Sequence, residues 1–498
     1  MPGGTSIRKD EQSMKQPNII WFCTDQQRYD TIAALGNSHI RTPNLDRLVH
    51  EGVAFTRAYC QNPICTPSRS SFMTGRYPRT VRASINGNEH FSKDETVVTK
   101  LLADSGYTCG LIGKLHLTSH YRRMEERTDD GYTYLEWSPQ PCDDWAPGLN
   151  RYMEWLKDKG VDWHKEYVMP CEWPPRNHYT LPERIKGLPE AHHQTTWCVD
   201  KTIDFIENYE GDAPWCLSVN PFDPHPPFDP PQEYKDRINI DDMPLPLWQE
   251  GELDNKPFAH KDCYLNGSQK GMVRDTVNMT DAEKREITRD YYAEIELMDH
   301  QVGRLLDYLD RKGLRQDTVI VYMSDHGEML GDHGIYWKGG YFYEGLIHVP
   351  LIVSCPGRIQ QGVVSNALVE LVDVAPTLLE LAGLPVPEYM QGKSFLPILT
   401  GEAPADHHKD KIYTEFYFST MLMHKIYATM MFDGRYKIAI HHGEDICELY
   451  DLENDPNEFH NLWNNPEYAA LQTRLTKECF DHAILCNIDR VMGCRFNY

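Results

Sequence analysis

Long apolar runs and closely paired cysteines are both missing from this sequence. No stretch approaches the roughly 18 apolar residues that a membrane-spanning helix needs. None of the 14 cysteines forms a C-x-x-C pair, which disfavours a zinc ribbon and a thioredoxin-like motif. The segment Met1–Gln16 is polar and lacks the apolar core of a signal peptide. We therefore expect a cytoplasmic protein without a membrane anchor, whose thiols are mostly reduced and buried.

Positive charge is scarce as well. Lysine and arginine together number 50 against 74 aspartates and glutamates, which gives a formal net charge of -24. Such a chain repels polyanions, so neither nucleic acid nor an anionic membrane is expected as a partner. If the substrate is an anion, its site must concentrate positive charge locally, and a bound metal ion is one way to do that.

Short apolar runs rich in β-branched residues alternate with segments of helical periodicity. Continuous apolar runs are typical of strands covered on both faces. The predicted strands are Asn18–Cys23, Thr108–Ile112, Trp215–Val219, Thr318–Met323 and Pro350–Val353. The predicted helices are Thr42–Glu51, Thr96–Ser105, Thr195–Tyr209 and Asp281–Lys312. The alternation predicts an α/β fold with a large, mostly parallel sheet flanked by helices. Residues 121–189 and 229–280 are expected to be surface insertions that shape a pocket.

The pattern changes after about Leu399. The predicted strands there are Lys411–Phe418, Tyr427–Phe432, Tyr436–His441 and Glu448–Asp451, followed by a helix over Pro466–Cys479. Short strands joined by turns such as Asp433-Gly434 indicate a smaller α+β unit with a short antiparallel sheet. We expect a polar N-terminal extension (1–16), a catalytic α/β domain (17–399) and a C-terminal α+β subdomain with a tail (400–498).

Reactive side chains follow four of the predicted strands. They are Asp25-Gln26, Lys114 with His116, His225, and Asp325-His326. A single aspartate after a strand is usually a helix cap, but ligands of open α/β sheets bind at the carboxyl ends of the strands. Four such ends therefore predict one convergent site. Within it, Asp25, Asp325 and His326 offer oxygen and imidazole ligands for a divalent cation.

Cys65 opens a predicted helix that ends at Gly75. Pro67 suits the first turn of that helix, and Gly75 suits its C-terminal cap. The amides and dipole at a helix N-terminus favour anions. From these features alone, Cys65 is either a structural thiol or a nucleophile whose pKa is depressed.

The segment Cys65-Thr66-Pro67-Ser68-Arg69 resembles the signature of type I sulfatases, which share the alkaline-phosphatase-like fold. In that family a formylglycine-generating enzyme oxidises the cysteine to Cα-formylglycine. Further matches follow in the family's order over nearly the whole chain. They are Pro17-Asn18-Ile19-Ile20, Thr42-Pro43-Asn44-Leu45-Asp46, Thr74-Gly75, Gly113-Lys114-Leu115-His116, His225-Pro226-Pro227, Ser324-Asp325-His326-Gly327, Lys338, Glu448-Leu449-Tyr450-Asp451-Leu452 and Asp455-Pro456-Asn457-Glu458.

The resemblance implies a metal site and a modified residue. Asp25, Asp325, His326 and the aldehyde hydrate formed from Cys65 would bind one divalent ion, with Ca²⁺ expected and Mn²⁺ or Mg²⁺ as alternatives. Gln26 stands where many sulfatases have a second aspartate, so its role as a ligand departs from the family pattern. The hydrate would supply the nucleophile, and the metal would make its hydroxyl reactive near neutral pH.

The resemblance also implies catalytic roles. Arg69 would orient the hydrate, while Lys114 and Lys338 would hold the sulfate oxygens. His225 would protonate the departing alcohol, and His116 would act on the second hydroxyl of the hydrate. Cations placed around a transferring anion stabilise its charge. The implied reaction is hydrolysis of sulfate monoesters, as in arylsulfatases.

Two other functions stay open. Phosphonate monoester or phosphodiester hydrolases of the same superfamily also use formylglycine, and Asp25-Gln26 with Asp325-His326 resembles their metal set, whereas Gly113–His116 is typical of sulfatases. An inactive binding homologue would be expected to lack a key group. Asn86, 21 residues after the cysteine, is a further candidate for substrate contact. The alcohol part of the substrate is not readable, and a homo-oligomer is compatible with the sequence.

Three adjacent histidine pairs resemble metal ligands but lack matched partners. They are His192-His193, His407-His408 and His441-His442. We expect these six side chains to be polar surface residues.

Overall fold

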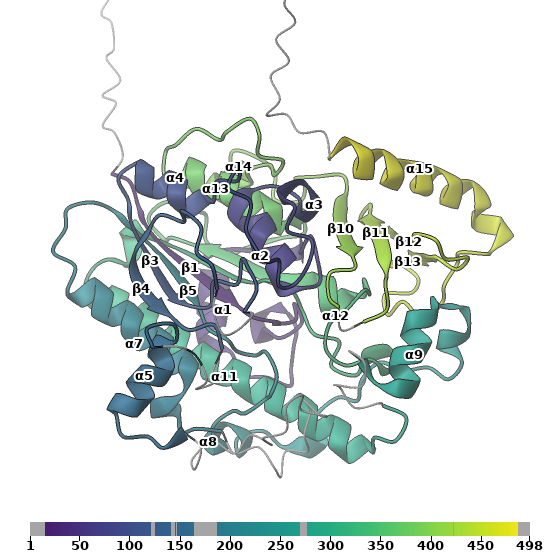
Figure 1. Cartoon of the computed structure of the whole chain (residues 1–498), viewed down its shortest axis with the longest axis horizontal. Helices are drawn as coiled ribbons and strands as arrows, with labels where there is room; N and C mark the ends of the chain where they lie inside the picture. The colour runs from purple at the N-terminus through teal and green to yellow at the C-terminus, as the bar shows by residue number, and fades with distance from the viewer. Residues whose placement is uncertain are drawn as a thin grey trace, which may run out of the picture.

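A computed structural model describes residues 15–120, 125–140, 145, 147–163, 187–268, 276–421 and 423–486. Its core is a nine-stranded sheet in the order β4-β3-β5-β1-β6-β7-β2-β8, with β9 paired to β2 (Figure 1). The strands are β1 (Asn18–Thr24), β2 (Gly52–Tyr59), β3 (Thr108–Gly113), β4 (Tyr132–Trp137), β5 (Trp215–Asn220), β6 (Thr318–Ser324), β7 (His348–Ser354), β8 (Val363–Ser365) and β9 (Val369–Glu370).

The centre of this sheet is parallel, as predicted. Strand β1 lies between β5 and β6, and both pairings are parallel. Strand β7 is antiparallel to both β6 and β2, so the sheet is mixed. A buried strand has the same continuous apolar composition in either direction, which is why the sequence did not reveal this reversal. Strand β2 was not predicted, and β4 lies inside the segment 121–189 that was assigned to an insertion.

Helices cover both faces of the sheet because alternate residues of its strands point in opposite directions. On one face, Ile20 and Phe22 of β1 pack in a core with α1 (Pro43–His50), α7 (Gln194–Glu207) and α11 (Asp281–Arg311). On the other face, the β1 residues Ile19, Trp21 and Cys23 belong to the core that includes side chains of α2 (Cys65–Thr74), α4 (Val98–Asp104) and α13 (Val374–Leu381). These two helical layers are visible above and below the sheet in Figure 1. The predicted α/β architecture is confirmed.

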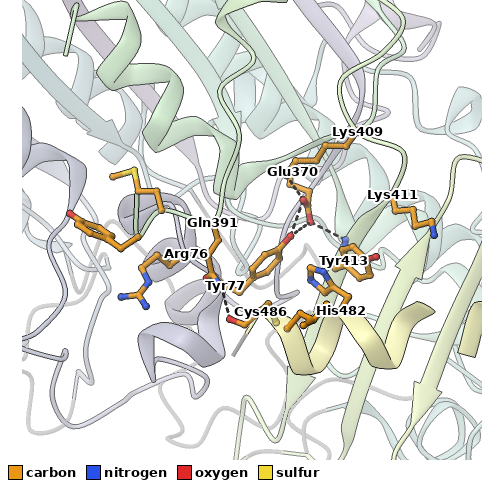
Figure 2. A pocket seen from close by; sticks show the side chains of 12 residues that line it. Arg76, Tyr77, Glu370, Gln391, Lys409, Lys411, Tyr413, His482 and Cys486 are labelled. Atoms are coloured by element: carbon orange, nitrogen blue, oxygen red, sulfur yellow. Dashed lines mark hydrogen bonds and ion pairs between the residues drawn. The ribbon is translucent and has the colours of Figure 1, made fainter. Parts of the chain in front are cut away.

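The C-terminal region forms the predicted small α+β unit. Its antiparallel sheet has the order β10 (Ile412–Tyr417), β11 (Tyr427–Phe432), β12 (Tyr436–His441) and β13 (Glu448–Asp451). Helix α15 (Ala469–Leu485) packs against β11 and β12 and runs six residues beyond the predicted end at Cys479. Where this unit meets α2 and α3 (Pro78–Val81), a cavity of about 320 Å³ is lined by residues such as Tyr77, Glu370 and Tyr413 (Figure 2).

Parts of the sequence predictions lie outside the described residues. These are nearly all of the N-terminal extension, the tail from 487 onward, and residues 121–124, 141–144, 146, 164–186 and 269–275 of the insertions. The described part of the second insertion carries α8 (Gln232–Lys235) and α9 (Phe258–Asn266). Among the described residues, no helix is both long and apolar enough to cross a membrane.

The prediction that the paired histidines are surface residues is wrong for one member of each pair. His193, His408 and His441 are buried. Each faces a buried carboxylate, with nitrogen–oxygen distances of 3.2 Å to Asp223, 3.4 Å to Asp373 and 2.8 Å to Glu448, respectively. Burial of a polar ring is tolerated where a partner compensates its desolvation, and the sequence does not reveal partners that are distant in the chain.

The prediction for the thiols is confirmed in the described part of the chain. Its eleven cysteines are all buried and unpaired.

Candidate active site

Helix α2 places Cys65 in the interior of the protein. The cysteine is the first residue of the helix, and the residue before it, Ile64, has extended backbone angles and provides no side-chain cap. Asn86 takes over part of that capping role, because its Oδ1 accepts hydrogen bonds from the Thr66 hydroxyl at 3.0 Å and the Thr66 amide at 3.4 Å. The helix ends at Gly75, whose φ of 68° is the left-handed geometry that glycine adopts without strain.

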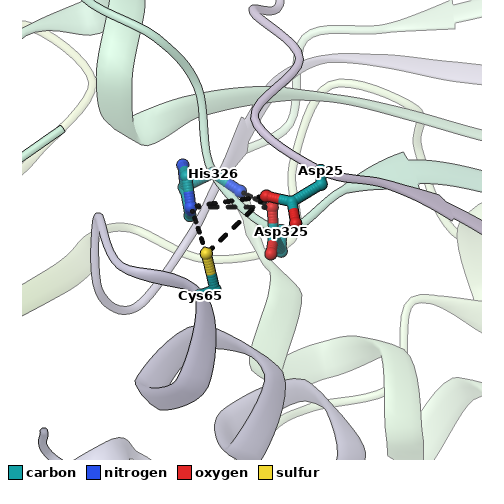
Figure 3. Close-up of side chains that lie close together, drawn as sticks. All are labelled: Asp25, Cys65, Asp325 and His326. Carbon is teal, nitrogen blue, oxygen red and sulfur yellow. Dashed lines mark hydrogen bonds and ion pairs between the residues drawn. The ribbon is translucent and has the colours of Figure 1, made fainter. Parts of the chain in front are cut away.

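Asp25, Cys65, Asp325 and His326 come together at the carboxyl ends of β1 and β6 and the start of α2 (Figure 3). Their ligand atoms all lie within 4.8 Å of one another, and each residue is at most 1% exposed. The Cys65 sulfur lies 3.2 Å from His326 Nε2 and 3.6 Å from an Asp25 oxygen. His326 Nε2 lies 3.8 Å from Asp325 Oδ1. We call these four residues the catalytic cluster.

Three buried cations border the catalytic cluster. Lys338 donates to the Cys65 sulfur at 2.9 Å, and Lys114 donates to Asp25. Arg69 donates from Nε to Asp325 Oδ2 at 2.8 Å. This concentration of lysine and arginine provides the local positive charge that an anionic substrate of an acidic protein needs.

These contacts set the ionisation of the cluster. Burial alone would raise the pKa of Asp25, but Lys114, His225 and Lys338 hold it well below its usual range. Burial and Asp25 oppose ionisation of the Cys65 thiol, yet Lys114, Lys338 and His326 outweigh them and lower its pKa. The site therefore favours anions on both residues.

Gln26, next to Asp25 in the chain, has a buried amide oxygen of the kind that binds divalent metal ions. Its φ of 73° is unusual for a residue with a side chain, and its backbone amide donates to Asp325 Oδ1 at 3.1 Å. The side-chain nitrogen donates to Glu328, while Oε1 is buried without a hydrogen-bond partner. Sequence reasoning missed Glu328, because an acidic residue three positions after Asp325 carries no distinctive spacing.

Two histidines lie at the edge of the catalytic cluster. Burial and the charge of Lys338 hold the pKa of His225 well below its usual range, and His225 Nδ1 lies 2.8 Å from the carbonyl of Pro226. His116 stacks on His120 with ring centroids 4.3 Å apart, and its Nδ1 is buried without a hydrogen-bond partner. Burial, His120 and Lys114 also lower the pKa of His116. Burial and the neighbouring charges therefore disfavour the protonated form of both imidazoles.

The structure thus brings the strand-end residues together as the sequence predicted. Asn86, the other predicted contact, does not bond to the catalytic cluster. Its described hydrogen bonds go to Thr66 of α2 and, from its backbone amide, to the carbonyl of Ser419. Its role in substrate contact stays a prediction, as do the catalytic roles of the other residues.

Residues 17–384 match the sulfatase family, and residues 331–483 match the C-terminal region of N-sulphoglucosamine sulphohydrolase. The chain belongs to the sulfatase family. It is a hydrolase of sulfuric ester bonds, and the resemblance carried by the Cys65 segment is confirmed.

Relatives of this sulfatase cover almost its whole length. An arylsulfatase of Clostridium perfringens is 30% identical over 471 residues, 91% of each chain. An N-acetylglucosamine-6-O-sulfatase of Bacteroides thetaiotaomicron is 28% identical over 517 residues, covering 93% of this chain and 86% of the other. The solved structure of a phosphonate monoester hydrolase of Agrobacterium radiobacter aligns with a TM-score of 0.79 at 26% identity, over 94% and 96% of the two chains.

Proposed function

We propose that this sulfatase hydrolyses sulfate monoesters with a formylglycine made from Cys65 and a single divalent metal ion. The observation that carries the proposal is a buried cysteine at a helix N-terminus, surrounded by two carboxylates, an imidazole and three cations. Maturation would require a formylglycine-generating enzyme that meets the chain before it folds, because Cys65 is only 1% exposed. We place the maturation of Cys65 and the hydrolysis of the sulfate ester in the cytoplasm.

The residues of the chain would divide the work. Lys114 and Lys338 hold two sides of the sulfate group, where their charge stabilises the negative charge of the transferring group. Arg69 fixes Asp325 through a charge-assisted hydrogen bond and so holds the carboxylate in one orientation. His225 delivers a proton to the leaving oxygen, and an incoming anion would raise its pKa toward the working range. His116 holds a proton beside residue 65.

The donor set fits a divalent metal ion. Asp25, Asp325, His326 and the hydrate of residue 65 would hold the ion, and the unpartnered Oε1 of Gln26 gives a fifth donor. When bound, the ion supplies Lewis-acid polarisation and lowers the pKa of a hydroxyl. Oxygen donors suit Ca²⁺, our first choice, while the imidazole of His326 favours Mn²⁺ more than Ca²⁺. Metal analysis of the purified protein distinguishes the two.

The modification is tested by mass spectrometry of the tryptic peptide that spans Cys65. We expect an aldehyde in place of the thiol, and a hydrazide reagent should label that peptide. Cys65→Ser expressed in the same cells is the control and should give no label. Fully active protein with only unmodified cysteine would replace this proposal by the thiolate mechanism, which the lowered pKa of Cys65 would then explain.

Hydrolysis of phosphonate monoesters or phosphodiesters is the second candidate. The observation in its favour is the structural similarity to the phosphonate monoester hydrolase. His326 in the catalytic cluster and Gln26 next to Asp25 also agree with it. Sulfate monoesters and phosphodiesters carry the same single charge, so charge alone does not separate them. We expect kcat/KM to be higher for an aryl sulfate than for a phenylphosphonate ester of the same phenol. A tenfold preference in the opposite direction would make the phosphonate hydrolase the better assignment.

A further inference from the structure

A second buried group of metal-ligand side chains lies where the insertion meets the C-terminal sheet. His260 comes from α9, His441 ends β12, and Glu448 begins β13. Their ligand atoms lie within 4.8 Å of one another, and the residues are 0%, 2% and 2% exposed, respectively. We call these three residues the interface cluster. Nothing in the proposed reaction uses them.

The hydrogen bonds of the interface cluster leave two ring nitrogens open, His260 Nε2 and His441 Nδ1. His441 Nε2 lies 2.8 Å from Glu448 Oε2, and Tyr450 donates to the other carboxylate oxygen at 2.6 Å. The Nδ1 atom of His260 lies 2.9 Å from the Tyr343 hydroxyl. Its Nε2 atom is buried without a hydrogen-bond partner and faces Glu448 Oε2 at 3.8 Å, which is too long for a hydrogen bond.

A cation between His260 Nε2 and Glu448 Oε2 would give the ring nitrogen the partner it lacks. Buried polar atoms in native proteins are almost always paired, so an unpaired ring nitrogen that faces a carboxylate calls for an explanation. Two imidazoles and one carboxylate are a common ligand set for zinc. Zinc bonds of about 2.0–2.2 Å at tetrahedral angles place ligand atoms about 3.4 Å apart, close to the 3.8 Å observed between His260 and Glu448. The contact between His441 and Glu448 would open by a few tenths of an ångström.

The surroundings orient the imidazoles and add negative charge. Burial raises the pKa of Tyr343, and the carboxylates of Glu448, Glu252 and Glu458 raise it further. The cation of Lys256 opposes them, and it is held by the Glu458 carbonyl at 2.6 Å and the Tyr343 hydroxyl at 3.1 Å. The Tyr343 hydroxyl is in turn the outer partner of His260, and this contact at Nδ1 orients the ring and leaves Nε2 facing Glu448.

We propose that His260, His441 and Glu448 bind a structural zinc ion that ties α9 to the C-terminal sheet. His260 lies more than 180 positions before His441 and Glu448 in the chain, so the ion would link the insertion to β12 and β13. Helix α9 also contacts the segment that follows Lys338, because Cys263 lies 2.5 Å from the Tyr341 hydroxyl. The zinc ion would therefore brace the loop that carries Lys338. This proposal stands independently of the substrate of the catalytic cluster.

The test counts zinc in the full-length protein. Chains incubated with ZnCl₂ and freed of unbound metal by gel filtration are analysed by elemental mass spectrometry. The Asp325→Ala protein removes one ligand of the catalytic cluster, so that zinc held there does not confuse the count. We expect one zinc ion per chain in this protein, and none when His260→Gln is added. His442→Gln changes the neighbouring, exposed histidine, and it should keep the zinc.

Stability provides the second measurement. Zinc should raise the melting temperature of the Asp325→Ala protein by a few degrees, and the rise should vanish with His260→Gln but not with His442→Gln. If Asp325→Ala or His260→Gln fails to fold, the loss of one zinc ion between wild type and Glu448→Gln serves instead. Folded protein that binds no zinc outside the catalytic cluster would overturn the proposal, and so would full retention of zinc in folded His260→Gln.

Discussion

The catalytic cluster and a second charged region show how differently buried charge is used in one chain. The second region lies beside the cavity of Figure 2 and consists of Glu370, Asp373 and Lys409, which we call the closed cluster. Lys409 bonds to both carboxylates, and its distance to Asp373 Oδ1 is 2.6 Å. The carboxylate oxygens also accept from the backbone amides of Tyr413 at 2.9 Å and Lys393 at 2.7 Å.

The catalytic cluster is equally buried but not closed in this way. Three polar atoms of residues around it are buried without hydrogen-bond partners, namely Gln26 Oε1, His116 Nδ1 and one terminal nitrogen of Arg69. In the closed cluster, each charge has a partner within the protein. In the catalytic cluster, unpartnered atoms border a group of ligands. The comparison indicates that buried charge by itself does not mark a binding site, because the closed cluster is buried and yet each of its charges is paired.

Removing one carboxylate should abolish metal binding and activity in the catalytic cluster but leave both nearly unchanged in the closed cluster. We expect Asp325→Ala to lose the metal and to lower kcat/KM for an aryl sulfate by at least about 10,000-fold, roughly 5.5 kcal/mol of transition-state stabilisation. Asp373→Ala is the matched control, and folded protein should keep its metal and nearly all of its activity. Metal content and kcat/KM are measured on the folded fraction of each variant. An Asp325→Ala protein that kept one catalytic metal ion per chain, beyond any zinc held by the interface cluster, would show that the ligand set is wrong.

Charge removal from the closed cluster should affect stability alone. Lys409→Met leaves Glu370 and Asp373 buried without their cation, which we expect to cost about 3–5 kcal/mol of unfolding free energy. Denaturant unfolding measures the loss, and the kcat/KM of the remaining folded protein should stay within about twofold of wild type. An equally large loss of kcat/KM in folded protein would mean that the closed cluster is coupled to catalysis and would remove the contrast drawn above.

The two clusters also differ in how far the sequence predicted them. Asp25, Lys114 and Asp325 each follow an unbroken apolar run, so their convergence followed from the rule for strand ends. Lys338 follows no strand and was assigned by resemblance alone. The partners of His408 and His441 could not be predicted, because each bond depends on the packing of segments far apart in the chain. The reversal of β7 was hidden for a related reason, since its pairing is set by its neighbours rather than by its composition.

Lys114 tests whether the cations of the catalytic cluster select the substrate. We expect Lys114→Ala to lower kcat/KM for an aryl sulfate about 100-fold, or roughly 2.7 kcal/mol, because a buried charge beside the transferring group is lost. The loss should be smaller for a phosphodiester of the same phenol if this lysine sets the preference. Lys114 also bonds to Asp25, so metal content must be measured in parallel. Equal losses on both substrates would assign Lys114 to metal-site geometry rather than selectivity.

Glu415 is expected to give the smallest effect. It is a buried carboxylate of the C-terminal sheet whose charge, unlike those of the closed cluster, is only partly compensated. It lies in β10, accepts from the Arg79 amide at 2.7 Å, and has the Arg79 Nε at 3.7 Å. Burial raises the pKa of Glu415 from 4.5 to about 7. Between these values the folded protein holds a proton that the unfolded chain has released, so the free energy of unfolding falls as the pH rises through this window and levels off above about pH 7.

Glu415→Gln should remove this slope, because the amide does not titrate. We expect the wild type to lose on the order of 1–2 kcal/mol more stability than the Glu415→Gln protein between pH 5 and pH 8, since each pKa unit corresponds to about 1.4 kcal/mol. Denaturant unfolding at several pH values measures the difference. Glu478→Gln is a control, because this half-buried carboxylate has a pKa lowered by Lys411 and should give the opposite sign at lower pH. Parallel pH profiles for wild type and Glu415→Gln would mean that Arg79 compensates the charge of Glu415 fully.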